Sequence, residues 1–156
     1  MIVITGFPRS GTTALGELLG SSDCGQYFGE IFHPDGYAYS EHQKEVRLRP
    51  AANFFRYLDQ EMEPSLRLGP PVVSRLLERW GAYVDFIESL AGGRRPIVDI
   101  KYSNWRNCSP ASEWLLDDPF LFSLVFSRMP TVVIHLVRRN VLEQACLLYT
   151  SDAADE

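Results

Sequence analysis

The chain has 156 residues, of which 46% are apolar and 22% charged, the balance of a globular domain rather than a disordered segment. The net charge of −5 argues against a surface for nucleic acid or an anionic membrane. Its three cysteines form neither a metal-type pair nor a disulfide framework, so we expect a reduced, cytoplasmic setting. No apolar run approaches the roughly 20 residues of a membrane span. The N-terminus enters a strand at once, and we expect no signal peptide.

The chain opens with a strand, a glycine-rich loop and a helix. Ile2–Thr5 is apolar and β-branched, which is typical of a strand buried on both faces of a parallel sheet. The segment Gly6–Thr13, called the glycine loop below, follows it. Four apolar residues then recur at helical spacing: Ala14, Leu15, Leu18 and Leu19.

The middle of the chain predicts loop and helix. Residues 23–50 are rich in Gly, Tyr and charge with weak periodicity, so we expect mostly loop there. Residues 53–62 predict a short helix. Residues 72–90 predict the clearest helix, because apolar side chains recur at three and four residues. Gly92 and Gly93 are expected to end it.

Two further strands follow. Residues 97–100 predict a strand that closes on Lys101, and residues 131–137 predict another buried strand leading into a helix from Val141. Between them, residues 114–128 predict a largely buried helix that Pro119 divides. Strands that alternate with helices predict an α/β fold with a parallel sheet.

The glycine loop has the composition of an anion-binding turn. A loop between a strand and a helix N-terminus can direct backbone N–H groups at a phosphate. Gly6 and Gly11 keep the Walker spacing, but Thr12 stands where the lysine of that pattern would be, which argues against a nucleoside triphosphate. The cation of the loop is instead Arg9. The hydroxyls of Thr12 and Thr13 could cap the helix or donate to phosphate oxygens, and a plain tight turn is the alternative.

The string Gly6-Phe7-Pro8-Arg9-Ser10-Gly11-Thr12-Thr13 resembles the 5′-phosphosulfate loop of sulfotransferases that use 3′-phosphoadenosine-5′-phosphosulfate. The resemblance implies a P-loop NTPase-like domain, incomplete at its C-terminus. It also implies that Arg9, Ser10, Gly11, Thr12 and Thr13 hold the 5′-phosphosulfate. Arg9 would be catalytic as well, because a cation near the bridging oxygen offsets the charge that builds on the leaving phosphate.

The family's second signature is a strand that runs into an arginine and then a helix bearing a serine, which together bind the 3′-phosphate. Residues 132–137 followed by Arg138 and Arg139 resemble its first half. The resemblance favours Arg138 as the phosphate ligand, with Arg139 second, and the rigid fork of arginine suits phosphate. The expected serine would fall at about position 146 or 147, where the chain has Cys146 and Leu147.

Residues 146–156 resemble the conceptual translation of a transposase-type sequencing adapter. We therefore expect residues 1–145 to be the N-terminal portion of a sulfotransferase domain and residues 146–156 to be a non-native tail. The native protein would then continue past Ala145, and the 156-residue chain would have little or no turnover.

Residues 29–34 are similar to a segment of bacterial trehalose (glycolipid) 2-sulfotransferases, in which an acid follows the loop arginine by the same 21 residues that separate Arg9 from Glu30. The similarity implies that Glu30 is the base that deprotonates the acceptor. His33 is the second candidate for that role. Residues 97–105 are similar to a G-x-K-x-x-W-like strand of that family, so Lys101 is expected to face the sulfonate or the acceptor, although Asp99 could instead pair with it in a structural role. Trp105 could stack on a sugar ring.

The sequence therefore predicts a sulfotransferase that acts, without a metal, on a hydroxyl of a carbohydrate or glycolipid. The first alternative is a degenerate P-loop kinase for a small molecule, which would need Mg²⁺ and a lysine near the γ-phosphate. The second alternative is a nucleotide-binding fragment without activity.

Overall fold

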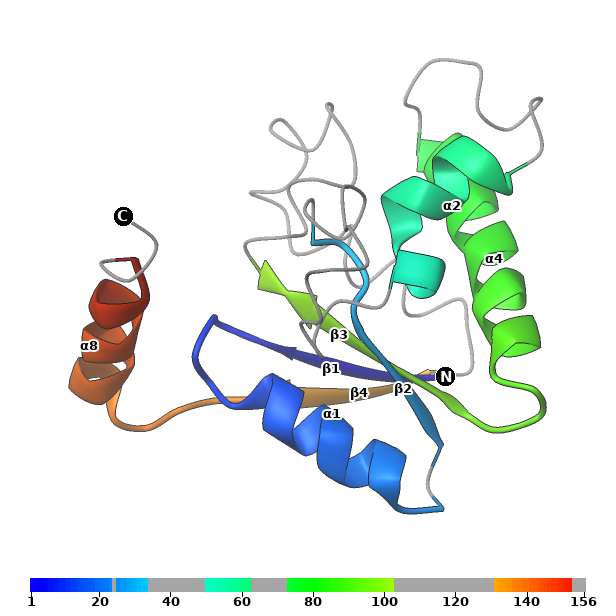
Figure 1. The fold of residues 1–156 in the computed structure, drawn as a ribbon. Helices are drawn as coiled ribbons and strands as arrows, with labels where there is room; N and C mark the ends of the chain where they lie inside the picture. Colours follow the sequence, from blue (N-terminus) through cyan, green and yellow to red (C-terminus); the bar gives the residue numbers. More distant parts are fainter. Residues whose placement is uncertain (24, 34–49, 63–72, 103–130, 153–156) are drawn as a thin grey trace.

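The computed structural model describes residues 1–23, 25–33, 50–62, 73–102 and 131–152. They contain four parallel strands in the order β2-β3-β1-β4 (Figure 1). The strands are β1 (Ile2–Gly6), β2 (Gln26–Glu30), β3 (Pro96–Lys101) and β4 (Val132–Leu136). Because they are parallel, their carboxyl ends lie at one edge of the sheet, which is called the carboxyl edge below. The prediction of an α/β fold with a parallel sheet is confirmed.

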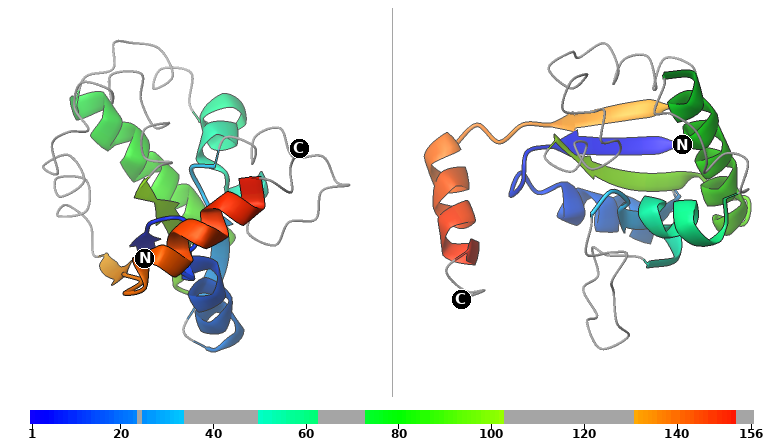
Figure 2. Two further views of the ribbon diagram at one scale, coloured as in Figure 1. Left: turned by 90° about the vertical axis from the view of Figure 1, so that its left-hand side faces the viewer. Right: turned by 90° about the horizontal axis from the view of Figure 1, so that it is seen from above.

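Helices cover both faces of this sheet. Helix α1 (Thr12–Ser21) packs on one face, and α2 (Phe54–Gln60) and α4 (Val73–Leu90) lie on the other (Figure 1). A short 3-10 turn, η2 (Pro50–Ala52), precedes α2. Helix α8 (Val141–Asp152) stands beyond the carboxyl edge in all three views (Figures 1 and 2). Asn140 caps α8, because its Oδ1 accepts a hydrogen bond from the N–H of Glu143 at 3.1 Å.

Two glycines allow α1 to lie close to the sheet. A Cβ at Gly16 would overlap the ring of Tyr27 in β2, and a Cβ at Gly20 would lie 2.7 Å from the Cβ of Tyr27. Ile2, Ile4 and Ile97 of the sheet complete this layer with Leu15, Leu19 and Ile134. This contact fixes the N-terminus of α1 at the carboxyl edge.

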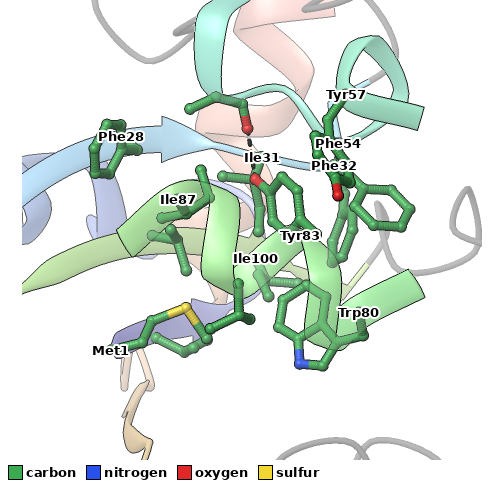
Figure 3. Packing of buried hydrophobic residues seen from close by; sticks show 14 of the residues in the cluster. Met1, Phe28, Ile31, Phe32, Phe54, Tyr57, Trp80, Tyr83, Ile87 and Ile100 are labelled. Atoms are coloured by element: carbon green, nitrogen blue, oxygen red, sulfur yellow. Dashed lines mark hydrogen bonds between the residues drawn. The ribbon is translucent and has the colours of Figure 1, made fainter. Parts of the chain in front are cut away.

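The main core lies on the opposite face and is largely aromatic (Figure 3). Phe32, just after β2, packs edge-on against Phe54 of α2, with ring centroids 4.9 Å apart. The buried hydroxyl of Tyr83 in α4 donates a hydrogen bond to the carbonyl oxygen of Ala52 at 2.5 Å (Figure 3). The core thereby anchors the segment that follows Glu30, the last residue of β2, and that contains His33.

Several predicted elements differ from the structure. Residues 26–30, expected in a loop, form strand β2. The burial predicted for residues 131–137 is wrong, because β4 pairs only with β1 among the described strands and Val132 and Val133 are 52% and 40% exposed. The helix predicted from Val141 is observed as α8, which ends at Asp152. The helix predicted over residues 114–128 lies outside the described residues. None of the described helices is long and apolar enough to cross a membrane.

Candidate anion-binding site at the carboxyl edge

The strand register brings the candidate residues together. Gly6, which ends β1, pairs with Lys101 of β3 on one side and with Leu136 of β4 on the other. Glu30, which ends β2, pairs with Asp99 of β3. The glycine loop therefore begins between Lys101 and the segment that carries Arg138. Ligands of open α/β sheets bind at this edge.

The glycine loop has an unusual backbone. Arg9 has a φ of 62° and Gly11 a φ of 94°, so both are left-handed, and Arg9 is the only non-glycine with a positive φ among the described residues. The N–H of Ser10 donates to the carbonyl oxygen of Phe7 at 3.2 Å, which closes the turn. Turns that mix right- and left-handed residues can present successive N–H groups to an anion.

Helix α1 begins at this loop without a side-chain cap. Gly11, which has no side chain, occupies the N-cap position, so no side-chain cap hydrogen bond is found there. Capping by Thr12 or Thr13, one of the two roles considered from the sequence, is therefore not observed. Ser10 Oγ is buried without a hydrogen-bond partner among the described residues, a condition that native structures usually satisfy with a ligand or water.

A buried charged cluster adjoins the loop. The ammonium of Lys101 donates hydrogen bonds to Thr12 Oγ1 and to Asp99 Oδ2, the latter at 2.5 Å. Glu30 Oε1 lies 3.5 Å from the same ammonium. All four side chains belong to residues that are at most 6% exposed. Burial raises the pKa of the Asp99 carboxyl, although the attraction of Lys101 opposes the shift. The pairing of Asp99 with Lys101 that the sequence suggested is observed.

A β-bulge directs Glu30 toward this cluster. Tyr27 pairs with Ile97, but Glu30 rather than Gly29 pairs with Asp99, so β2 contains one extra residue at this point. Gly29 has a φ of 76°, which glycine adopts without strain. The extra residue shifts the alternation of β2 and brings Glu30 beside Lys101.

Arg138 contacts the glycine loop directly. Its Nη1 donates to the carbonyl oxygen of Arg9 at 3.0 Å, and its Nη2 lies 2.8 Å from Glu143 Oε1. Gln144 Nε2 donates to the carbonyl oxygen of Pro8 at 2.7 Å. Between the loop and α8 lies a mainly apolar cavity of about 370 Å³, lined by Phe7, Pro8, Ser10, Leu136, Val137, Arg138, Val141, Gln144 and Ala145.

The remaining predicted residues lie less centrally. Arg139 is exposed, and no contact joins it to the glycine loop among the described residues. His33 is half-buried, its N–H donates to the carbonyl oxygen of Glu30 at 3.4 Å, and its own carbonyl oxygen accepts from Asn53 Nδ2 at 2.9 Å. Trp105 lies outside the described residues. The sequence analysis did not single out Gln144. Its only signal was its position, one turn into the helix predicted from Val141.

In comparisons with protein-family models, curated proteins and solved structures, the chain has no match. The functional assignment therefore rests on the glycine loop, the Lys101 cluster and the contact between Arg138 and Arg9.

Proposed function

We propose that the chain is the nucleotide-binding part of a sulfotransferase with a P-loop NTPase-like fold. It would transfer a sulfuryl group from 3′-phosphoadenosine-5′-phosphosulfate to a hydroxyl of a carbohydrate or glycolipid, in a reduced, cytoplasmic setting. The observation that carries the proposal is the 3.0 Å hydrogen bond from Arg138 to the carbonyl oxygen of Arg9. It joins the two segments that the sequence assigns to the two ends of one doubly phosphorylated adenosine.

The glycine loop would hold the 5′-phosphosulfate. Arg9 and Gly11 supply the left-handed backbone, and the uncapped N-terminus of α1 adds its partial positive charge. The hydroxyl of Ser10 would be a further donor at the same place, and those of Thr12 and Thr13 would join it by exchanging their contacts with Lys101 and Tyr27 for the phosphate. The buried, unpartnered Ser10 Oγ supports this assignment, because a bound oxygen would satisfy it.

Arg138 would bind the 3′-phosphate, with Arg139 as the second candidate. A guanidinium has five N–H donors, and the contacts to Arg9 and Glu143 leave donors for a phosphate. The side chain of Arg138 is 28% exposed, so a ligand can reach it. The apolar cavity beside it would pack against the rings of the nucleoside.

Glu30 would act as the base. It takes the proton from the acceptor hydroxyl while the hydroxyl oxygen forms a bond to sulfur. The bond between sulfur and the bridging oxygen breaks, and its electron pair stays on the 5′-phosphate, which leaves as adenosine 3′,5′-bisphosphate. Arg9 offsets the charge on that phosphate. Lys101 would contact the transferred group or the acceptor, and His33 and Trp105 would lie on the acceptor side. This scheme needs no metal.

A degenerate P-loop kinase is the second candidate, and one observation favours it. Lys101 reaches Thr12, the position at which a Walker loop carries its lysine, so a cation is present there after all. A nucleotide-binding module without turnover is the third candidate, and it predicts the same binding behaviour as the sulfotransferase.

Calorimetric titration separates these candidates. We expect adenosine 3′,5′-bisphosphate to bind in the presence of EDTA. Mg-ATP should bind at least about tenfold more weakly, a difference of about 1.4 kcal/mol in binding free energy. Binding of Mg-ATP in preference to the bisphosphate would support the kinase and refute the sulfotransferase. Transfer of labelled sulfuryl groups to a glycolipid mixture then distinguishes an enzyme from a binding module.

A further inference from the structure

The ammonium of Lys101 lies at the position from which the loop lysine is missing. Lys101 ends β3 and pairs with Gly6, and its side chain contacts Thr12, the first residue of α1. In the pattern G-x-x-x-x-G-K-[ST], the residue after the second glycine is the lysine that reaches the phosphates. Here that residue is Thr12, and a neighbouring strand delivers the cation to it.

Asp99 is the group that fixes this ammonium. Asp99 and Lys101 are two residues apart on β3, so their side chains lie on the same face of the sheet, the face that α1 covers. Asp99 is fully buried in the middle of the sheet opposite Ile4, and its Oδ2 lies 2.5 Å from the ammonium. A long, flexible lysine side chain is thereby held against α1 rather than free in solvent.

The ammonium has one long contact that a ligand could replace. It has three N–H donors, of which Thr12 and Asp99 accept two at hydrogen-bonding distance. Glu30 Oε1 pairs with the ammonium from 3.5 Å, the weaker contact, and an anion oxygen could take its place. We propose, on the basis of the anion site assigned above, that Lys101 is the cation that faces the bound anion and that Asp99 is the positioning residue that holds it there.

The loss of either group would act differently on anion binding. Without Lys101, the carboxylates of Asp99 and Glu30 would face the loop without a counter-ion and would repel an anion. Without the Asp99 carboxylate, the ammonium would remain but would no longer be fixed beside Thr12. The effect of Asp99 on anion affinity must therefore pass through Lys101, whereas a purely structural effect would not.

Calorimetry with two probes, inorganic pyrophosphate and adenosine 3′,5′-bisphosphate, tests the proposal. We expect K101M to lower the affinity for both probes by roughly 10- to 100-fold, the effect of losing a charge-assisted hydrogen bond. We expect D99N to lower the affinity for both probes by roughly three- to tenfold, which is within the range of coupling between residues in contact. In the K101M background, D99N should have no further effect. R95M, which changes an exposed cation just before β3, is the matched control and should bind like the wild type.

Each outcome decides between a functional and a structural cluster. Unchanged affinity in K101M, equal losses from D99N in both backgrounds, or no binding of pyrophosphate to the wild type would overturn the proposal. If K101M fails to fold, D99N/K101M removes both charges together and should still show the loss. Binding of pyrophosphate but not of the bisphosphate, with the same dependence on Lys101, would refute the sulfotransferase and leave the role of Lys101 intact. If K101M binds the bisphosphate as well as the wild type does, the role of Lys101 is refuted and the sulfotransferase proposal remains.

Discussion

The guanidinium of Arg138 donates a hydrogen bond to the carbonyl oxygen of Arg9 over 3.0 Å, although the two residues are 129 positions apart. The contact joins the loop after β1 to the segment after β4, and Gln144 adds a second bond from α8 to the carbonyl oxygen of Pro8. Because both bonds end on backbone oxygens of the glycine loop, they leave the side chain of Arg9 available to a ligand. Loop conformation and the position of Arg138 are therefore coupled.

The left-handed conformation of Arg9 predicts a separation of stability from binding. Arg9→Gly removes the cost of a left-handed non-glycine residue, about 1–2 kcal/mol, but adds the chain entropy of glycine, so the free energy of unfolding should change by less than about 1 kcal/mol. The affinity for adenosine 3′,5′-bisphosphate should fall at least tenfold, because the guanidinium is lost. Urea unfolding and calorimetry measure the two effects. Parallel losses in both would contradict the prediction.

Gly6 and Gly81 should respond to the same substitution with opposite signs. A Cβ at Gly6 would lie 2.7 Å from both the carbonyl oxygen of Leu136 and Ser10 Oγ, so Gly6→Ala should cost about 1–3 kcal/mol. Nothing lies within 4 Å of a Cβ at Gly81 in α4, where Gly81→Ala should gain about 0.5–1 kcal/mol. Denaturant unfolding of the two variants measures this difference. A stable Gly6→Ala variant would show that β1 and β4 do not approach as described.

The buried Asp99 predicts a pH dependence of stability. Burial raises the pKa of Asp99 in the folded protein, with Lys101 opposing the shift and Glu30 adding to it. From the unfolded value of about 3.9 upward, the folded state therefore holds more protons than the unfolded state, and stability falls as pH rises until Asp99 ionises in the folded protein. Relative to D99N, the wild type should lose stability as the pH rises from about 4, until Asp99 is ionised in the folded protein as well. A relative gain, measured by urea unfolding at each pH, would contradict this.

The hydrogen bond from Tyr83 to Ala52 predicts a cost in the core. Tyr83→Phe keeps the ring but leaves the buried carbonyl oxygen of Ala52 without this donor, so the free energy of unfolding should fall by about 1–3 kcal/mol. Thermal unfolding measures the effect. Anion affinity should not change, because Tyr83 lies in the core on the face opposite α1. A change in affinity without a change in stability would show that the core does more than support the segment after β2.

Much of the fold could be predicted from the sequence, because its signals are local. The apolar run of β1 and the three- and four-residue spacing of α4 predict elements within one residue of those observed. Strand β2 was missed because it has only five residues and is interrupted by Gly29 and a bulge, although its Tyr and Phe favour a strand. The exposure of β4 could not be predicted, since it depends on which strands are neighbours.

The sequence could predict which residues form the candidate site better than it could predict the contacts between them. The spacing of Asp99 and Lys101 places them on one face of a strand, but only the packing of α1 shows that Lys101 meets Thr12. The left-handed backbone of Arg9 has no signal in the sequence, because arginine does not favour it. Glu30 reaches the cluster through the bulge at Gly29, which depends on the pairing with β3.

The most direct measurement compares the affinity of Arg138→Ala for adenosine 3′,5′-bisphosphate and for adenosine 5′-monophosphate, which lacks the 3′-phosphate. The account predicts that the substitution weakens binding of the bisphosphate roughly tenfold or more beyond its effect on the monophosphate, because both ligands share any change in the loop but only the bisphosphate loses a phosphate contact. Arg139→Ala, tested in parallel, identifies which arginine is responsible. Equal losses for both ligands would mean that Arg138 only supports the loop through Arg9, and no loss for either would mean that it does not bind the nucleotide.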